Sequence, residues 1–318
     1  MALAPSPADR LAAELDRLVR PGARLGVAVS GGPDSLALLL LAGAARPGLV
    51  EAATVDHGLR PESKDEAKRV GEICSGLAIR HVVLTVSLGV RPHSNLQARA
   101  REARYEALGG WAMAQRLAVV ATAHHADDQA ETVLMRLARG AGVGGLSGIQ
   151  RMRPLPKGDG QLIRPLLSWR RSELRAVVHE AGLVPVDDPA NADERFDRSR
   201  VRALLAATPW LEPHRLASSA SNCREADEAL DWIADREFDQ RHRRDGAALK
   251  LDPHGLPAEL QRRLLLIAIE RLTGKSPAGP QVSDALAALQ SGATTTLAGL
   301  KIEGGRSWRL APAPPRRS

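Results

Sequence analysis

The chain has 318 residues, a length typical of two domains. Hydrophobic residues make up 44% and charged residues 25% of it, which excludes a wholly disordered chain, and the lack of any run of 18 apolar residues excludes a transmembrane helix. The net charge is +7, and because only 6 of the 44 basic residues are lysines, arginine supplies most of the positive charge. This composition raises the question of a nucleic-acid partner.

Strand-like and helical segments alternate from residue 25 onward. Short apolar or β-branched runs predict strands, whereas longer segments with helical periodicity predict helices. The strands are expected at 25–30, 49–56, 81–87 and 117–123, and the helices at 34–45, 61–76, 95–117 and 126–139. This alternation predicts an α/β fold with a doubly wound, mainly parallel sheet, in which ligands bind beyond the carboxyl ends of the strands.

The pattern changes after residue 140. Residues 140–165 are rich in glycine and proline, so we expect a long loop there. From about Val201 helical patterns dominate, and the segments 294–302 and 307–311, which flank Gly304-Gly305, predict a hairpin. We therefore expect a first domain over residues 1–212 and a smaller, mostly helical domain over residues 213–318.

A glycine turn joins the first expected strand to the first expected helix. Its residues are Ser30, Gly31, Gly32, Pro33, Asp34 and Ser35. Two glycines permit positive φ and the close approach of a phosphate, and the amides at the helix start then point at that anion. Asp34 suits a Mg²⁺ ion held beside the phosphates, because a carboxylate needs a counter-ion there. The alternative is a tight turn with a helix N-cap, since Ser and Asp cap helices well.

Histidines and acids follow the fourth expected strand. His124 and His125 end that strand, and Asp127, Asp128 and Glu131 lie in the first turns of the next helix. Asp128 and Glu131 are three residues apart, so one helix face carries both carboxylates. The cluster allows three interpretations: a metal site, acids that stabilise the helix dipole, or paired carboxylates that bind a substrate ammonium. For Asp127, a role as helix N-cap is an equal alternative.

Positive charge is concentrated just after this helix. Residues 136–175 contain nine basic and two acidic side chains, a local charge as large as that of the whole chain. Such a stretch suits contact with a phosphate backbone, and an aromatic content of only 3% favours recognition by shape and charge over base stacking. For any single arginine the alternative is a solvated surface side chain.

Several blocks, in order over residues 24–205, resemble one family of enzymes. Residues 30–35 look like the SGGxDS loop of the PP-loop ATP pyrophosphatase superfamily, and the other blocks are similar to the tRNA(Ile)-lysidine synthetase family. Those blocks are Val55–Arg60 with Ser63, Asn95–Arg101 with Arg104 and Tyr105, Thr122–Thr132 with Met135–Gly140, Gly145–Ile149, and Arg164–Leu167. Residues 187–202 approximate a further block, in which Ala190 and Ser199 stand where the family usually has Ser and Asn.

The resemblance implies a ligase that modifies tRNA. ATP activates the C2 oxygen of the wobble cytidine of isoleucine tRNA with a CAU anticodon, and free lysine then attacks C2 and expels AMP. For ATP the implied residues are Ser30, Gly31, Gly32, Pro33, Asp34, Ser35, Asp56 and His57, with Asp34 on Mg²⁺. For lysine they are Asp128, Glu131, Arg198 and Arg202, while His124 contacts the nucleotide or positions the reacting base. For tRNA we expect Arg99, Arg101, Arg104, Arg136, Arg139, Arg151 and Arg153.

Two other functions are consistent with part of this pattern. One is another PP-loop enzyme that adenylates tRNA, such as a thiolase, although the chain has no CxxC motif. The other is a non-catalytic RNA-binding protein, against which the intact glycine turn and acidic helix argue. Cys74 and Cys223 form no disulfide framework, which favours a cytoplasmic setting. The resemblance also allows a homodimer, and we expect the C-terminal domain to contact tRNA.

Overall fold

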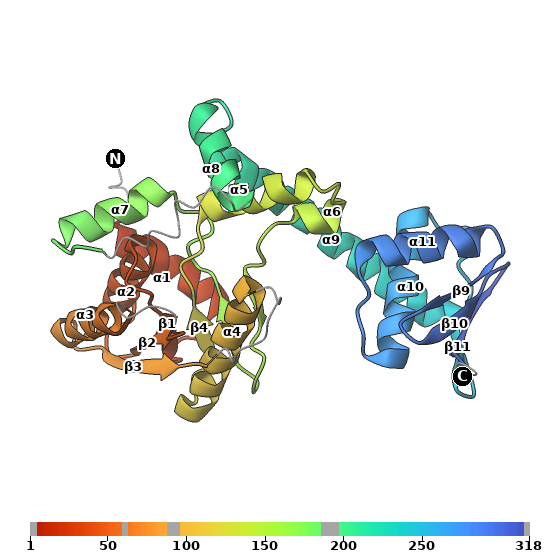
Figure 1. Ribbon diagram of the computed structural model, residues 1–318, viewed down its shortest axis with the longest axis horizontal. Coiled ribbons are helices and arrows are strands. Elements are labelled where there is room, and N and C mark those ends of the chain that lie inside the picture. The colour runs from red at the N-terminus through yellow and green to blue at the C-terminus, as the bar shows by residue number, and fades with distance from the viewer. Residues whose placement is uncertain (1–4, 59–62, 88–95, 186–196, 315–318) are drawn as a thin grey trace. The chain divides into compact units, whose positions relative to one another are not determined.

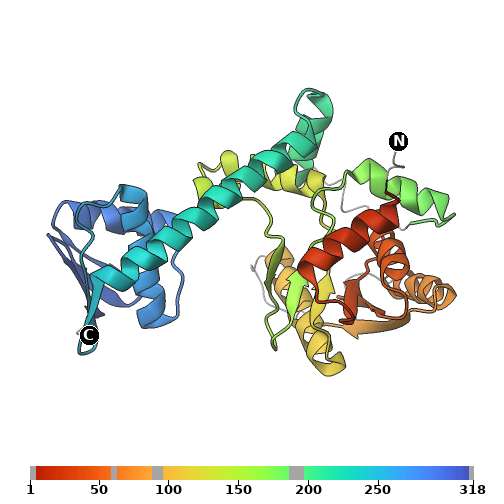
Figure 2. The ribbon, with the colours of Figure 1, turned by 180° about the vertical axis from the view of Figure 1, so that it is seen from behind.

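The computed structural model describes residues 5–58, 63–87, 96–185 and 197–314 (Figure 1). The chain divides into two compact units, Met1–Cys223 and Arg224–Ser318. The division falls inside the long helix α9, Pro213–Arg241 (cyan in Figure 2), whereas we expected a domain boundary near residue 212. Within the described ranges, no helix is long and apolar enough to cross a membrane. Leu59, Arg60, Asn95 and residues 187–191 of the sequence blocks lie outside the described residues.

The first unit is built on a six-stranded sheet with the order β3-β2-β1-β4-β6-β5. Every neighbouring pair of strands is parallel except β5 and β6. The strands are β1 Leu25–Ala28, β2 Val50–Asp56, β3 Arg80–Thr85, β4 Val119–Ala121, β5 Met152–Pro154 and β6 Gln161–Ile163. The α/β fold with a mainly parallel sheet is therefore confirmed.

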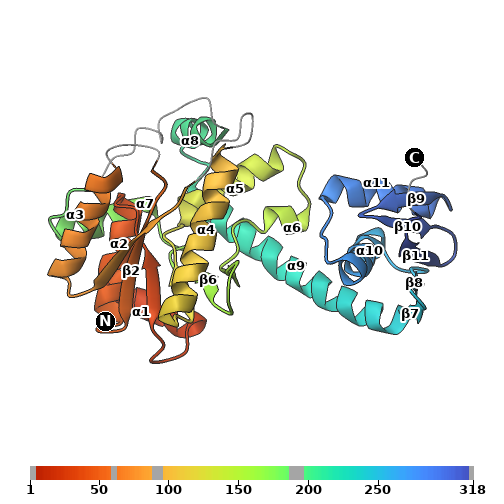
Figure 3. The same ribbon diagram turned by 60° about the horizontal axis from the view of Figure 1, so that its bottom comes forward.

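Helices cover both faces of this sheet, on opposite sides in Figure 3. On one face, α2 is apolar almost all round and packs between α1 and α7, as expected of a fully buried helix. On the other face α4 contributes the buried side chains of Tyr105, Leu108 and Trp111. The helices of the unit are α1 Pro7–Leu18, α2 Pro33–Ala45, α3 Ser63–Gly76, α4 Leu96–Gln115, α5 Ala126–Leu137, α6 Val143–Leu146, α7 Arg171–Glu180 and α8 Asp197–Ala207, together with the start of α9.

The strand order decides where a ligand binds. From β1 the chain moves outward through β2 to β3, and then crosses back to place β4 on the other side of β1. The order in which the chain adds strands to the sheet therefore changes direction between β1 and β4. Open parallel sheets bind ligands at such a switch point, beyond the carboxyl ends of the strands. The turn after β1 and the segment after β4 are the two motifs identified in the sequence.

The expectation of a long loop over residues 140–165 is wrong. This segment contains the short helix α6 and the strands β5 and β6, of which β6 extends the parallel sheet beside β4. Each of these strands has three residues, which is too short for an alternating pattern to appear in the sequence. Their pairing with a sheet that already exists, rather than local propensity, stabilises them.

The second unit combines helices with a five-stranded antiparallel sheet of order β7-β8-β11-β10-β9. The expected strand over 294–302 is two strands, because Ala298 and Gly299 both adopt positive φ and form a two-residue turn. Buried Trp308 and Phe238 lie in one core with α10 and α11. The elements are β7 His242–Asp245, β8 Ala248–Leu251, α10 Ala258–Thr273, α11 Gly279–Gln290, β9 Thr294–Leu297, β10 Leu300–Glu303 and β11 Trp308–Pro312.

Candidate active site

The glycine turn is closed by its two serines. The Ser30 amide donates to Ser35 Oγ at 3.1 Å, the two hydroxyl oxygens are 3.2 Å apart, and Ser35 Oγ donates to the Gly32 carbonyl at 2.9 Å. Gly31 has φ of +85°, a conformation that favours glycine. Gly32 is the N-cap of α2 and supplies no side-chain capping bond. The serines and Asp34 are therefore not used as caps, and the first amides of α2 face the end of the sheet.

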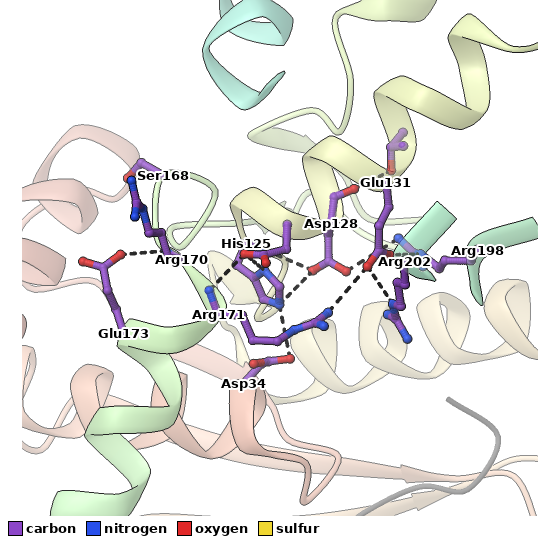
Figure 4. A network of polar contacts seen from close by, with 12 residues as sticks. Asp34, His125, Asp128, Glu131, Ser168, Arg170, Arg171, Glu173, Arg198 and Arg202 are labelled. Atoms are coloured by element: carbon purple, nitrogen blue, oxygen red, sulfur yellow. Dashed lines mark hydrogen bonds and ion pairs between the residues drawn. The ribbon is translucent and has the colours of Figure 1, made fainter. Parts of the chain in front are cut away.

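A buried histidine connects this turn to the start of α5 (Figure 4). His125 is 1% exposed, and its Nε2 lies 3.3 Å from Asp34 Oδ2 and 3.6 Å from Asp128 Oδ2. Its Nδ1 lies 3.4 Å from Asp127 Oδ2. The switch point of the sheet thus brings residues from two separate sequence motifs into one polar network.

Three carboxylates keep this histidine charged. Burial by itself would lower the pKa of His125, but contacts with Asp127 and Asp34, together with the charge of Asp128, outweigh burial and raise the pKa to about 9. The reciprocal effect lowers the pKa of Asp127 to about 2: burial opposes the change, and His125 and the Arg171 amide dominate it. At neutral pH the network is an imidazolium surrounded by carboxylates.

Asp127 and Asp128 have different partners. Asp127 Oδ2 accepts from the Arg171 amide at 3.0 Å and so joins the start of α5 to the start of α7. Asp128 Oδ2 accepts from the amide of His125, the N-cap of α5, at 3.1 Å. It is thus Asp128, rather than Asp127, that bonds back to the cap residue. The other Asp128 oxygen, Oδ1, faces the Arg198 guanidinium at 3.6 Å.

Glu131 shares the partner Arg198 with Asp128, and further arginines contact its carboxylate. The carboxylate is 1% exposed, and it accepts from Arg198 Nε at 2.7 Å and from Arg202 Nε at 2.6 Å. Arg171 approaches the same carboxylate at 3.5 Å. The structure therefore brings together all four residues expected to bind lysine, and it adds Arg171, which belongs to the basic stretch 136–175 but was not expected at this position.

A basic cavity adjoins this network. Its volume is about 530 Å³, and among the described residues its wall holds His124 and five arginines but no acid. Burial lowers the pKa of His124, and Arg164, Arg104 and Arg101 act in the same direction against Asp128, so the imidazole is neutral at pH 7. His124 Nδ1 contacts Thr122 Oγ1 at 3.0 Å. The five arginines are Arg101, Arg136, Arg153, Arg164 and Arg198.

Tyr105 organises part of this wall. Its ring lies under the guanidinium groups of Arg153, at 4.0 Å, and Arg101, at 5.1 Å. Its hydroxyl bonds to Arg164, and although burial raises the pKa of Tyr105, the surrounding arginines lower it overall. Arg136 donates to the Gly145 and Gly148 carbonyls at 2.8 and 2.9 Å, which fastens the α6 segment to α5.

The expected tRNA-binding arginines do not all reach this cavity. Arg101, Arg136 and Arg153 lie in its wall, whereas Arg99, Arg104, Arg139 and Arg151 are not among its lining residues. Arg151 pairs with Glu14 of α1 at 3.1 Å. Sequence reasoning missed Arg164 and Tyr105 as site residues, although both belong to the blocks that carry the family resemblance.

Asp56 and His57 lie at the carboxyl end of β2. Asp56 Oδ1 accepts from the Gly58 amide and from Ser63 Oγ, each at 2.8 Å, and these bonds lower its pKa. The Nδ1 atom of His57 is buried and has no hydrogen-bond partner among the described residues. A carboxylate with a fixed orientation and a free imidazole nitrogen are suited to contacts with a nucleotide.

Asp34 has a free oxygen. Its Oδ1 is buried and lacks a hydrogen-bond partner within the described part of the chain, whereas Oδ2 faces His125. In the same ranges, no group of three or more His, Cys, Asp and Glu side chains is arranged to hold a metal ion. A cation at Asp34 would therefore take at most two such side chains of the described part of the chain, and Mg²⁺ binds in this way when phosphates and water complete its shell.

The chain is similar to known proteins over most of its length. The model of the PP-loop domain family matches residues 7–208. The chain is 44% identical to a tRNA(Ile)-lysidine synthase of Zymomonas mobilis over 298 residues, which cover 92% of this chain and 90% of that protein. For the enzyme of the same name in Novosphingobium aromaticivorans, the identity is 46% over 301 residues, which cover 94% of this chain and 91% of that protein.

A solved structure supports the fold. The U34-tRNA thiolase NcsA of Methanococcus maripaludis superimposes with a TM-score of 0.57 over 70% of this chain and 78% of that protein. The sequence identity is 19%, so this similarity concerns the fold alone.

Proposed function

The chain belongs to the tRNA(Ile)-lysidine synthase family, and we propose that it acts on isoleucine tRNA with a CAU anticodon. It is a ligase that forms a carbon–nitrogen bond and modifies tRNA. In the first step the C2 oxygen of the wobble cytidine attacks the α-phosphorus of ATP, and pyrophosphate leaves. In the second step the lysine amine attacks C2, the C2–oxygen bond breaks, AMP leaves, and the amine loses a proton. The product is lysidine.

The turn of residues 30–35 binds the phosphates in this proposal. The α2 amides and the Ser30 and Ser35 hydroxyls supply donors, and Gly31 allows the backbone to approach the anion. The free Oδ1 of Asp34 suits Mg²⁺, which when bound would neutralise charge on the departing pyrophosphate. His125 holds the other oxygen of Asp34, so the carboxylate is fixed before ATP arrives. Asp56 and His57 complete the nucleotide site.

The residues around Glu131 bind free lysine. A lysine molecule carries a carboxylate and two amino groups, so it needs both cationic and anionic partners. Asp128 offers a carboxylate for an ammonium, whereas Arg198 and Arg202 offer guanidinium groups for the carboxylate. Glu131 is buried and paired with both arginines, so we assign it to fixing their position within the lysine site.

The basic cavity receives the target cytidine. Its arginines suit the phosphates that flank the base, and they also suit the negative charge that develops during adenylation. His124 is neutral, and burial and the surrounding arginines lower its pKa, so it suits a hydrogen bond that positions the base or the nucleotide rather than uptake of a proton. The remaining expected tRNA residues, Arg99, Arg104, Arg139 and Arg151, extend the basic surface of this unit.

Contact between the second unit and tRNA is also a proposal. In the register of its sheet Arg243 is opposite Lys250, and Lys250 is opposite Arg309. Opposed residues of antiparallel strands point to the same face, and all three of these side chains are exposed. Glu303 lies opposite Arg309 in the same row, and Asp245 lies 3.2 Å from Lys250. We propose that the basic residues of the row, which outnumber these acids, contact a phosphate backbone. We further propose action in the cytoplasm, where ATP and tRNA occur together, and a homodimer that light scattering would detect.

One observation supports the whole proposal most directly. One polar network joins the glycine turn to the acidic residues of α5 at one end of the sheet. It runs from Asp34 through His125 to Asp128, and from there through Arg198 to Glu131. A two-step reaction that uses ATP and then an amine requires this proximity.

Product analysis tests the proposal. The full chain is incubated with ATP, Mg²⁺, radiolabelled lysine and a CAU isoleucine tRNA transcript, and we expect AMP, pyrophosphate and lysine bound to tRNA. A transcript with guanosine in place of the wobble cytidine is the control. ADP as the product would contradict the proposal, and so would a failure to incorporate lysine. Sulfur incorporation would instead support a thiolase, and RNA binding without product would support a non-catalytic protein.

A further inference from the structure

A second cavity has Asp127 in its wall. Its volume is about 370 Å³, and it lies between the first turn of α7 and the start of α9. The residues that line it are Asp127, Arg170, Arg171, Ser172, Arg175, Glu212, Pro213 and His214. Nothing in the proposed reaction so far uses this cavity, although Asp127 belongs to both its wall and the His125 network.

The acids of this cavity have partners of their own. Asp127 contacts His125 and accepts from the Arg171 amide, while Glu212 Oε2 lies 3.0 Å from His214 Nδ1 and 3.7 Å from Arg215 Nε. Glu173, on the adjacent turn of α7, pairs with Arg10 of α1 at 2.6 Å. The three arginines that face the cavity therefore outnumber its two lining carboxylates, which leaves an excess of positive charge.

Two of the arginines keep an unbalanced charge. The Arg170 guanidinium contacts His214 Nδ1 at 3.0 Å and forms no ion pair with a described residue. The Arg170 amide donates to Glu173 Oε2 at 2.7 Å (Figure 4). Arg175 forms no ion pair with any described residue, and it lies one helical turn after Arg171, on the same side of α7. Arg171 itself is directed to Glu131. Arg170 and Arg175 therefore supply the excess positive charge.

We propose that this cavity binds a phosphate group during the reaction. Two guanidinium groups with His214 and the Ser172 hydroxyl offer several donors, and guanidinium forks match phosphate oxygens. The group has two possible sources, a backbone phosphate of the bound tRNA or the pyrophosphate released from ATP. The choice between them rests on the proposed function, but the presence of a phosphate subsite does not.

Single substitutions of the two unbalanced arginines test the subsite. Arg170→Gln and Arg175→Gln remove one charge each and leave Arg171 and the lysine site intact. Arg69→Gln, an exposed arginine on α3, is the matched control. Fluorescence anisotropy measures the Kd of the full chain for the tRNA transcript at several salt concentrations, without ATP or lysine. Inhibition of AMP formation by added pyrophosphate measures the second source.

The two sources give different results. If the cavity binds RNA, each substitution raises the Kd for tRNA by about fivefold. It also lowers the slope of log Kd against log salt concentration by about 1, the value for one phosphate contact, and the inhibition by pyrophosphate is unchanged. If it binds pyrophosphate, the Kd for tRNA is unchanged and the inhibition constant rises. Both quantities equal to those of Arg69→Gln would overturn the proposal. A wild-type chain that makes no lysidine, but whose RNA affinity still falls in Arg175→Gln, would retain the subsite and reject the proposed function.

Discussion

Substitution of Glu131 by glutamine tests the centre of the lysine site. The change preserves the shape of the side chain but removes its negative charge. Two arginine Nε atoms donate to the oxygens of this carboxylate, at 2.7 and 2.6 Å. One amide oxygen remains as an acceptor, so one of the two charge-assisted bonds is lost and the other is weakened. Each such bond contributes about 1.5–3 kcal/mol. Arg198 is 39% and Arg202 is 27% exposed, so water compensates part of the loss.

We therefore expect two effects of different origin. The unfolding free energy of the first unit falls by about 2 kcal/mol, which corresponds to a decrease in Tm of about 4–8 °C for a unit of this size. The arginines also lose their fixed position, so the KM for lysine rises by about tenfold or more, while the KM for ATP changes much less. Calorimetry measures the first effect, and initial rates of lysine incorporation measure the second.

The control variant is Glu228→Gln, an exposed substitution on α9 that removes the same charge. It should leave both KM values and the Tm unchanged. A Glu131→Gln enzyme with a lower Tm but a normal KM for lysine would show that Glu131 only braces α5 against α8. Equal increases in both KM values would show a general distortion of the site. Either result would refute the assignment of Glu131 to the lysine site.

Three further predictions concern the phosphate turn, the basic cavity and the buried imidazolium. Asp34→Ala should abolish the tRNA-dependent release of pyrophosphate and leave the Kd for tRNA within about twofold, because it removes a Mg²⁺ ligand; normal release would exclude that role. Tyr105→Phe keeps the ring under two arginines but removes the hydroxyl bonded to Arg164, so we expect a few-fold higher KM for tRNA at unchanged KM for ATP, and no change would exclude an organising role. The raised pKa of His125 predicts stability that is complete below pH 6.5 and is lost as the pH rises through about 9, by at most about 3 kcal/mol. The Tm in metal-free buffer with a chelator should follow this decline, His125→Gln should flatten it, and parallel curves for the two proteins would contradict the assignment.

The sheet could be predicted because each of its first four strands carries its own local signal. Val27 and its neighbours form a uniformly buried run, and the glycine turn and acidic helix follow β1 and β4 directly. Since the carboxyl ends of parallel strands share one edge, the proximity of the two motifs follows from the fold class. The ion pair between Asp34 and His125 is the physical result of that arrangement.

The partners of Glu131 could not be predicted in the same way. Arg198 and Arg202 were expected near the lysine site only through the family resemblance, and Arg171 was not expected there at all. These arginines are 40 to 71 residues away in the sequence, and they reach Glu131 from α7 and α8. Nothing in the local sequence of any of them distinguishes a buried ion pair from a solvated surface arginine. Long-range pairing of this kind depends on how the helices pack, which periodicity does not encode.

The structure also separates two roles within the excess of arginine. Some arginines form ion pairs in which one partner is buried: Arg202 pairs with the buried Glu131, and in the second unit the buried Arg263 pairs with Asp227, Asp231 and Glu259. Others, such as Arg153 and Arg175, line cavities in which arginines outnumber the acids among the described lining residues. The first group stabilises the fold and is poorly screened by salt, whereas the second is accessible to solvent and ions. RNA affinity should therefore depend strongly on ionic strength while the fold does not, because the same residue type performs the two tasks at different depths in the molecule.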